Sequence, residues 1–161
     1  MARKTFFSFH FERDAWRAGQ VRNSGLLMGD KAGFIDKAQW EEVKRNGNAA
    51  IEKWIDKQLE GTSTTVVLIG SETAGRKYIN YEIEQSAKRG NGLLGIYIHN
   101  VRTQNFETDT KGKNPFDDWY RTINGRKVYF SEVYPTYDWV MHDGRSNLGK
   151  WIEEAARKAK R

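Results

Sequence analysis

The chain contains no cysteine, which excludes disulfides, thiolate nucleophiles and cysteine-based metal sites. It also lacks a run of about 18 apolar residues, the length that a transmembrane helix needs. The start, MARKTFFSFHFERDAW, has an apolar patch that is too short and too soon followed by charge for a signal peptide. We therefore expect a cytoplasmic protein that has no membrane partner.

Internal repeats and low-complexity segments are absent as well. Hydrophobic residues make up 38% of the chain and include six Trp, seven Tyr and eight Phe, which argues against disorder. A chain of 161 residues suits one domain with one sizeable core. We predict a single domain over residues 1–161.

The net charge of +6 and the pI of about 9.5 raise the question of a polyanionic partner. The Lys and Arg residues are spread along the chain and cluster only in ARKAKR at the end. This distribution favours a solvated basic surface. Nucleic-acid binding is a weaker hypothesis than the two that are given at the end of this section. We do not expect nucleic acid to be the partner.

Apolar patterns typical of strands alternate with patterns typical of helices. STTVVLIGS (63–71) is a continuous β-branched run, as in a strand covered on both faces. Residues 4–9 and 92–100 also indicate buried strands, while residues 13–23, 51–59 and 76–90 indicate helices. This alternation predicts an α/β fold, a doubly wound, mostly parallel, flavodoxin-like sheet flanked by helices.

Other segments are less regular. SGLLMGD (24–30) allows a short strand, and residues 31–46 are ambiguous. Residues 100–118 are polar and predict a long loop. Asn124-Gly125 between two alternating runs predicts a β-hairpin. Helical spacing returns near residues 147–160.

In such sheets the ligand crevice lies beyond the carboxyl ends of the strands. That geometry directs attention to residues 8–10, to residues 70–72 and to the helix start that follows. GSETAGRKY (70–78) resembles a phosphate-binding loop, but Arg76 stands where the motif requires Lys. GNGLLG (90–95) matches a dinucleotide fingerprint, yet it ends a helix and opens a strand, so its N–H groups would point the wrong way.

Further site chemistries find little support. The strands ending near His10 and Ser71 offer no carboxylate of the kind that a receiver domain uses for Mg²⁺. His10, His99 and His142 do not form a metal spacing, and we expect no metal site. A Ser8–His10 nucleophile pair has no evident third partner.

The helix in RKYINYEIEQSAKRG (76–90) carries two glutamates, Glu82 and Glu84. On a helical wheel both fall at the boundary of the apolar stripe. Tyr78 lies one turn before Glu82, so an aromatic face and a carboxylate could meet one ligand, although periodicity alone favours a surface Tyr–Glu pair. Periodicity alone does not decide between the two glutamates.

FFSFHFERDAW, VRN, TTVVLIGSETAGRKYINYEI and GLLGIYIHN together resemble the TIR-like proteins of the Thoeris anti-phage system, the ThsB family. The resemblance implies a TIR-like, flavodoxin-related domain that cleaves the nicotinamide–ribose bond of NAD⁺. It implies a product, a cyclic ADP-ribose isomer, that activates a separate effector protein, and activation by a phage-derived trigger. NAD⁺ would be the substrate, with no cofactor.

The same resemblance implies the site residues. TIR enzymes carry an aromatic residue four positions before an essential Glu, which matches Tyr78 and Glu82. Their pocket also uses the end of the first strand and the following loop, which matches Ser8, Phe9 and His10 as substrate-binding residues. The aromatic position is often Trp, and Tyr here would alter the pocket shape. Glu84 is then expected to be ordinary surface.

A second hypothesis is a non-enzymatic TIR-like interaction or scaffold module, because TIR domains also serve as scaffolds and six Trp leave scope for an exposed aromatic patch. The sequence leaves open whether the chain forms a homo-oligomer.

Overall fold

The computed structural model describes residues 4–24, 31–34 and 37–161. The strands are β1 (Thr5–Ser8), β2 (Lys31–Ala32), β3 (Thr64–Ile69), β4 (Gly92–Tyr97), β5 (Tyr120–Ile123), β6 (Arg126–Tyr129) and β7 (Thr136–Asp138). The helices are α1 (Phe11–Arg22), α2 (Lys37–Arg45), α3 (Asn48–Leu59), α4 (Lys77–Lys88), α5 (Phe130–Val133) and α6 (Gly144–Lys158), with a 3₁₀ turn η1 at Pro115–Asp118.

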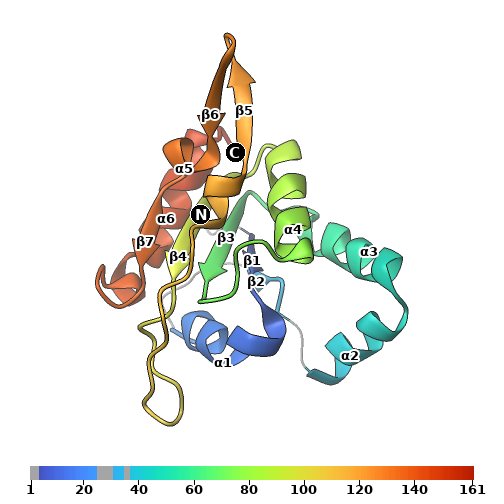
Figure 1. Ribbon diagram of the computed structural model, residues 1–161, viewed down its shortest axis with the longest axis vertical. Helices are drawn as coiled ribbons and strands as arrows, with labels where there is room; N and C mark the ends of the chain where they lie inside the picture. Colours follow the sequence, from blue (N-terminus) through green and yellow to red (C-terminus); the bar gives the residue numbers. More distant parts are fainter. Residues whose placement is uncertain (1–3, 25–30, 35–36) are drawn as a thin grey trace.

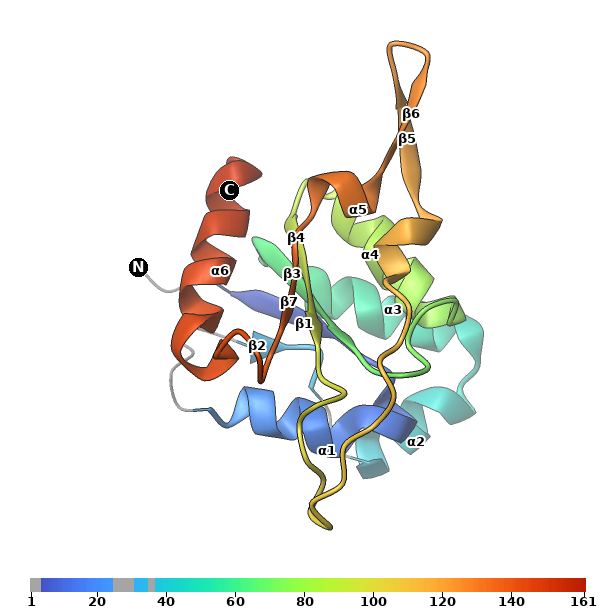
Figure 2. The same cartoon turned by 60° about the vertical axis from the view of Figure 1, so that its left-hand side comes forward.

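Five strands form the central sheet in the order β2-β1-β3-β4-β7, and all four pairings are parallel. This is the strand order of flavodoxin-like doubly wound folds, in which the chain winds outward in both directions from a central switch point. Helices cover both faces of the sheet (Figures 1 and 2). The α/β, TIR-like fold class predicted from the sequence is confirmed.

Strand β3 shows how the sheet builds two cores. Side chains alternate along a strand, so Val66 and Leu68 join the cluster under α1 and α6, while Val67 and Ile69 join the cluster under α4. Every residue of β3 is buried. A strand with apolar neighbours on both faces needs an unbroken apolar run, and this explains the sequence TTVVLI.

The side chains at the carboxyl end of strand β1 alternate between the two faces of the sheet in the same way. Phe7 joins the α1 and α6 side, whereas Phe6 packs against α3 on the opposite face. Ser8 is two residues after Phe6 and therefore points to the same face as Phe6. A fully buried hydroxyl is thereby placed beneath the helices α3 and α4.

Several local predictions need adjustment. The short strand predicted for residues 24–30 falls mostly on residues 25–30, which lie outside the described residues, and β2 follows it. The ambiguous segment 31–46 contains β2 and α2. Helix α4 has Arg76 as its N-cap, and the preceding Gly75 has a φ of 83°, in the left-handed region that favours glycine.

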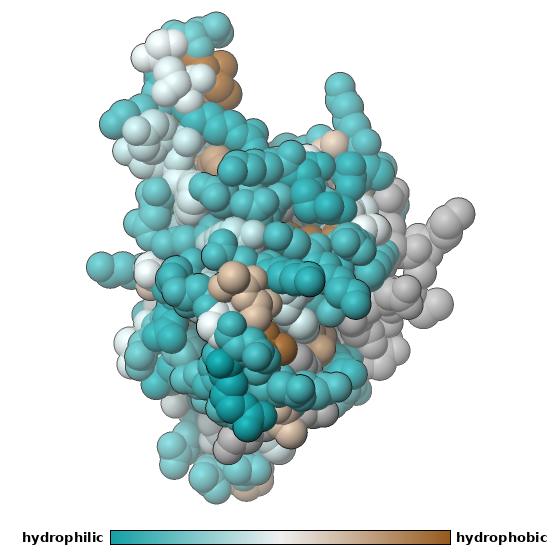
Figure 3. Space-filling view, turned by 90° about the vertical axis from the view of Figure 1, so that its right-hand side faces the viewer, coloured by the Kyte–Doolittle hydropathy of each residue, from teal (hydrophilic) through white to brown (hydrophobic). Residues whose placement is uncertain are grey.

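The β5–β6 hairpin stands away from the body of the molecule (Figure 1). Asn124 and Gly125 have φ angles of 53° and 78°, as a type I′ turn requires. The strands are almost entirely exposed, with Tyr120 opposite Tyr129. Figure 3 shows this projection on a face that is otherwise largely hydrophilic, with hydrophobic surface near its tip.

The long segment between β4 and η1 returns along the carboxyl edge of the sheet. Its backbone is tied to α1, because Arg17 donates hydrogen bonds to the carbonyl oxygens of Val101 (2.6 Å) and Glu107 (3.0 Å). Trp16 donates to the carbonyl of Arg102. None of the described helices is long and apolar enough to cross a membrane.

Candidate active site

A pocket opens beside the carboxyl end of β1, where the fold geometry predicts a ligand crevice. It encloses about 70 Å³, so a larger ligand must extend out of it or part its walls. Four helices and the β1–α1 junction contribute to it. Its lining comprises Phe7, Phe9, His10, Phe11, Glu12, Gly33, Trp40, Trp54, Ile55, Arg76, Tyr78, Ile79 and Glu82.

Glu82 is the buried carboxyl group of this pocket. Only 6% of the residue is exposed, and Ser8 Oγ donates a hydrogen bond of 2.7 Å to Glu82 Oε1. Burial raises the pKa of Glu82 to about 8, against the opposing effect of the Ser8 hydrogen bond. The carboxyl group is therefore mostly protonated at neutral pH.

Glu84 lies in a different environment on the same helix. Its side chain is 41% exposed and lies 3.7 Å from Lys88 Nζ in an i,i+4 ion pair on the surface. The buried residues of α4 are Ile79, Glu82, Ile83 and Ser86. The buried stripe thus includes Glu82, which the helical wheel had placed at its boundary, and leaves Glu84 outside.

Tyr78 lies one turn before Glu82 and also lines the pocket. Its ring packs against the cluster that α3 forms with Phe6, and its hydroxyl donates a hydrogen bond to Asn48 Oδ1 at the start of α3. Tyr78 therefore joins the pocket to α3. This contact fixes one wall of the site next to Glu82.

The three residues predicted at the end of β1 occupy different positions. Phe9 and His10 line the pocket. Phe9 packs near Phe11 and Phe34, with ring centroids 6.1 and 5.4 Å away. Ser8 is fully buried and is not part of the lining; its hydroxyl contacts the pocket through Glu82.

Two tryptophans complete the aromatic wall and were not assigned from the sequence. Trp40 on α2 lies 5.5 Å from Phe11 and 5.8 Å from Trp54 on α3, measured between ring centroids. All three side chains line the pocket. Apolar spacing indicates that such residues are buried, but it gives no sign that they face a cavity.

Some of the ionisable groups around the pocket are paired with an opposite charge or are neutral. Lys44 Nζ lies 2.6 Å from Glu12 Oε1, and this contact lowers the pKa of Glu12. Burial and then the positive charge of Arg76 lower the pKa of His10, so its imidazole is neutral near pH 7. Arg76, which stands where a phosphate-binding loop would have Lys, also lines the pocket.

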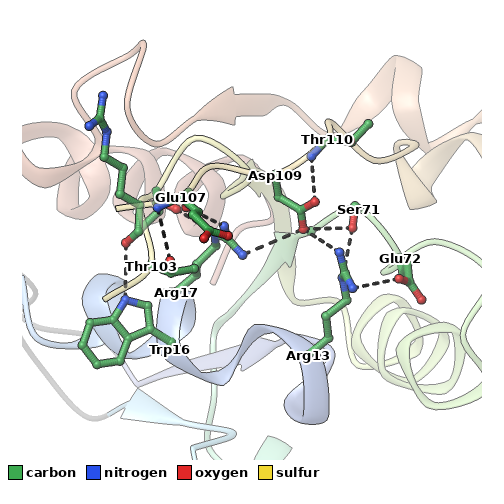
Figure 4. A network of polar contacts seen from close by, with 12 residues as sticks. Arg13, Trp16, Arg17, Ser71, Glu72, Thr103, Glu107, Asp109 and Thr110 are labelled. Atoms are coloured by element: carbon green, nitrogen blue, oxygen red, sulfur yellow. Dashed lines mark hydrogen bonds and ion pairs between the residues drawn. The ribbon is translucent and has the colours of Figure 1, made fainter. Parts of the chain in front are cut away.

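A polar network fixes the loop that leads into α4 (Figure 4). Arg13 lies 2.9 Å from Glu72, donates to Ser71 Oγ at 3.0 Å, and pairs with Asp109 at 2.7 Å. Ser71 also donates to Asp109. The network connects α1, the β3–α4 loop and the segment between β4 and η1 (residues 98–114, hereafter the strap). It therefore holds the start of α4 in place.

These features define what the site can do. A buried carboxyl group among aromatic rings can stabilise a cationic group, because a positive charge favours the ionised form that burial disfavours. The rings offer faces on which a planar ligand can stack. Within the described ranges, no three His, Asp or Glu side chains come together as a metal ion would require.

Comparison with known proteins identifies the family. The family described as "Thoeris protein ThsB, TIR-like domain" matches residues 6–103, which is more than half of the chain. The chain belongs to the ThsB family. The matched segment includes the end of β1 and the whole of α4, so all five predicted site residues lie within it.

A relative from Bacillus cereus (strain MSX-D12) is 31% identical over 191 residues of alignment, which cover 94% of this ThsB-family chain and 100% of the relative. That protein is named "Putative cyclic ADP-D-ribose synthase ThsB1". The likeness extends beyond the family match into the hairpin and α6.

Proposed function

We propose that this ThsB-family protein cleaves the nicotinamide–ribose bond of NAD⁺ and joins the ribose to the rest of the same molecule as a cyclic ADP-ribose isomer. The observation that carries the proposal is the buried carboxyl group of Glu82 in an aromatic pocket, hydrogen-bonded to Ser8 at 2.7 Å. The name of the Bacillus cereus relative supports the same reaction class.

One carboxylate suffices for this chemistry. As the bond to nicotinamide breaks, positive charge builds on the ribose, and a fixed carboxylate stabilises the oxocarbenium-like transition state. Nicotinamide leaves as a neutral molecule with the bonding electron pair, so no general acid is needed. Ordinary glycosidases use two carboxyl groups because their leaving alcohol must be protonated.

The protonation of Glu82 couples substrate binding to catalysis. The cationic nicotinamide ring of NAD⁺ favours the carboxylate over the neutral acid, so Glu82 loses its proton when NAD⁺ enters. Ser8 then donates its hydrogen bond to a charged oxygen, which strengthens the bond. Tyr78, Phe9 and the tryptophans supply ring faces for the nicotinamide or adenine.

Cyclisation requires a hydroxyl of the ligand to attack in place of water and to pass its proton to the Glu82 carboxylate, which favours a pocket that closes over its substrate. We propose NAD⁺ as substrate without a further cofactor, a cyclic nucleotide that acts on a separate effector protein, and activation by a phage-derived trigger.

The test is chromatography of NAD⁺ incubations with wild-type protein, with and without extract of phage-infected cells. The diagnostic variant is Glu82→Gln, which keeps the shape of the side chain but cannot become an anion. Loss of one transition-state stabiliser is expected to reduce turnover by roughly 100- to 1,000-fold. The products expected from wild-type protein are nicotinamide and a cyclic ADP-ribose isomer.

The matched control is Glu84→Gln, two residues away on α4 in a surface ion pair. It is expected to turn over NAD⁺ at the wild-type rate. The proposal is wrong if Glu82→Gln cleaves NAD⁺ as fast as wild type, or if Glu84→Gln loses activity to the same extent.

A second candidate function is a non-enzymatic interaction module. The exposed residues Tyr120, Ile123 and Tyr129 on the projecting hairpin favour it, whereas only Trp16 of the tryptophans is exposed. Stoichiometric binding of a partner that Glu82→Gln leaves intact, without NAD⁺ turnover in the presence of infected-cell extract, would support this function in place of the enzyme.

A further inference from the structure

Arg76 is the only lysine or arginine among the described side chains that line the pocket. It is the N-cap residue of α4, directly before Lys77, and its side chain is exposed. Arg76 forms no ion pair within the part of the chain that the structure describes. The guanidinium group is therefore available to a ligand at the mouth of the pocket.

None of the other ionisable groups in the described lining forms an ion pair with Arg76. Glu12 is already paired with Lys44 at 2.6 Å. Burial keeps the carboxyl group of Glu82 largely protonated by raising its pKa to about 8, and the lowered pKa of His10 leaves its imidazole neutral near pH 7. Arg76 thus places an unpaired guanidinium group at the pocket, which suits an anionic group of a ligand.

The spacing along α4 relates this charge to the carboxyl group. Arg76 precedes Glu82 by six residues, which is about 9 Å along a helix axis. The cavity of about 70 Å³ cannot enclose a dinucleotide. A ligand whose reacting ribose lies at Glu82 must therefore continue outward. In NAD⁺ the group that continues from this ribose, through its C5′ carbon, is the pyrophosphate.

We propose that Arg76 binds the pyrophosphate of the dinucleotide and so positions the nicotinamide-bearing ribose against Glu82. This inference rests on the proposed function and specifies the phosphate subsite of that site. A guanidinium group donates several parallel hydrogen bonds to phosphate oxygens, which gives orientation as well as affinity. Arg76 would thereby select phosphorylated forms of the nicotinamide nucleoside over the nucleoside itself.

The experiment measures equilibrium binding, so it does not depend on turnover. Wild type, Arg76→Gln and Lys77→Gln are titrated with ADP-ribose and with nicotinamide riboside, which has no phosphate. Binding is followed by fluorescence of Trp40 and Trp54, which line the pocket. Lys77→Gln is the matched control, because Lys77 is the adjacent cation on α4 but does not line this pocket.

Loss of a charge-assisted contact is expected to raise the Kd for ADP-ribose by roughly 10- to 100-fold in Arg76→Gln. The Kd for nicotinamide riboside, which is cationic and has no phosphate, should not rise, and Lys77→Gln should bind ADP-ribose as wild type does. The inference is overturned if Arg76→Gln binds ADP-ribose as tightly as wild type, if Lys77→Gln loses as much affinity, or if wild type binds ADP-ribose no more tightly than nicotinamide riboside.

NAD⁺ cleavage by wild type, measured separately, distinguishes a failure of the proposed reaction from a failure of the proposed phosphate subsite. If ADP-ribose binding depends on Arg76 but NAD⁺ is not cleaved under activating conditions, the proposed reaction fails and the phosphate subsite stands. If NAD⁺ is cleaved and ADP-ribose binding is indifferent to Arg76, only the subsite fails.

Discussion

Ser8 Oγ donates a hydrogen bond of 2.7 Å to Glu82 Oε1, and this contact joins the last residue of β1 to the second turn of α4. Both residues are buried. The pairing follows from strand alternation, which turns Ser8 towards the face that α4 covers. The contact fixes the position of the carboxyl group and opposes the rise in its pKa that burial causes.

Replacing Ser8 with Ala should raise the pKa of Glu82 above its wild-type value of about 8. The hydroxyl stabilises the carboxylate form, so its loss favours the neutral acid, by roughly 1–2 pH units for a hydrogen bond to a charged group. A ¹³C NMR titration of the Glu82 carboxyl carbon measures this directly. Ser86→Ala is the control, because Ser86 is buried one turn further along α4 and bonds to Thr65 instead. Equal midpoints in wild type and Ser8→Ala would contradict the prediction.

The raised pKa of Glu82 also predicts how stability depends on pH. A carboxyl group whose folded pKa exceeds its ordinary value of 4.5 stabilises the fold fully below pH 4.5 and loses this contribution as the pH rises to about 8. Wild type should therefore lose on the order of a few kcal/mol relative to Glu82→Gln between these limits. Urea unfolding at pH 5, 7 and 9 measures the difference.

The comparison with Glu82→Gln isolates this one group. Burial likewise raises the pKa of Asp14, to about 6, but Asp14 is present in both proteins and cancels from the difference. Glu84→Gln should parallel wild type across the same range, because Glu84 is a surface residue. Parallel curves for wild type and Glu82→Gln would exclude the assigned burial effect.

The architecture of the sheet could be predicted from the sequence because buried strands such as β3 are unbroken apolar runs between amphipathic helices. Strand β7 could not, since it has only three residues, all half-buried, and follows Pro135. Its position depends on pairing with β4. Such a strand is stabilised by its neighbour more than by its own pattern.

The site was harder to predict for a geometric reason. A helical wheel assumes one buried face, but α4 packs on the sheet and also, through Tyr78 and Tyr81, on α3. Its buried arc is therefore wide enough to include Glu82. Trp40 and Trp54 meet only when α2 folds onto α3, and this contact leaves no periodic signal in either segment. Family resemblance, rather than periodicity, distinguished Glu82 from Glu84.

Tyr78 should contribute mainly through its ring. Tyr78→Phe removes only the hydrogen bond to Asn48 and should keep the NAD⁺ KM within about threefold, the lower end of the effect of one neutral hydrogen bond. Tyr78→Ala removes a pocket wall and should raise KM by at least about tenfold, the scale of a lost aromatic contact. Steady-state NAD⁺ cleavage measures both effects.

Tyr81→Ala controls for packing in this comparison. Tyr81 contacts the same α3 cluster, and its hydroxyl bonds to Asp56, but it does not line the pocket. Both alanine variants should lose stability, while only Tyr78→Ala should raise KM. If the two variants raise KM equally, Tyr78 acts through the α3 contact and not as a wall of the pocket.

Gly112 should be essential to the strap that crosses the carboxyl end of β3. A Cβ at this position would lie 2.1 Å from the carbonyl oxygen of Gly70, and Gly70 has no freedom to retreat, because Asp14 lies against it and its N–H is bonded to Thr73. Gly112→Ala must displace the strap and weaken the Asp109 contacts to Arg13. We expect a loss of about 1–3 kcal/mol in the free energy of unfolding, measured by urea denaturation.

Gly19→Ala is the control, and its expected effect has the opposite sign. A Cβ at Gly19 meets nothing within 4 Å, so the change should stabilise α1 by roughly 0.5–1 kcal/mol. Unchanged stability in Gly112→Ala would mean that the strap does not press on β3 in solution.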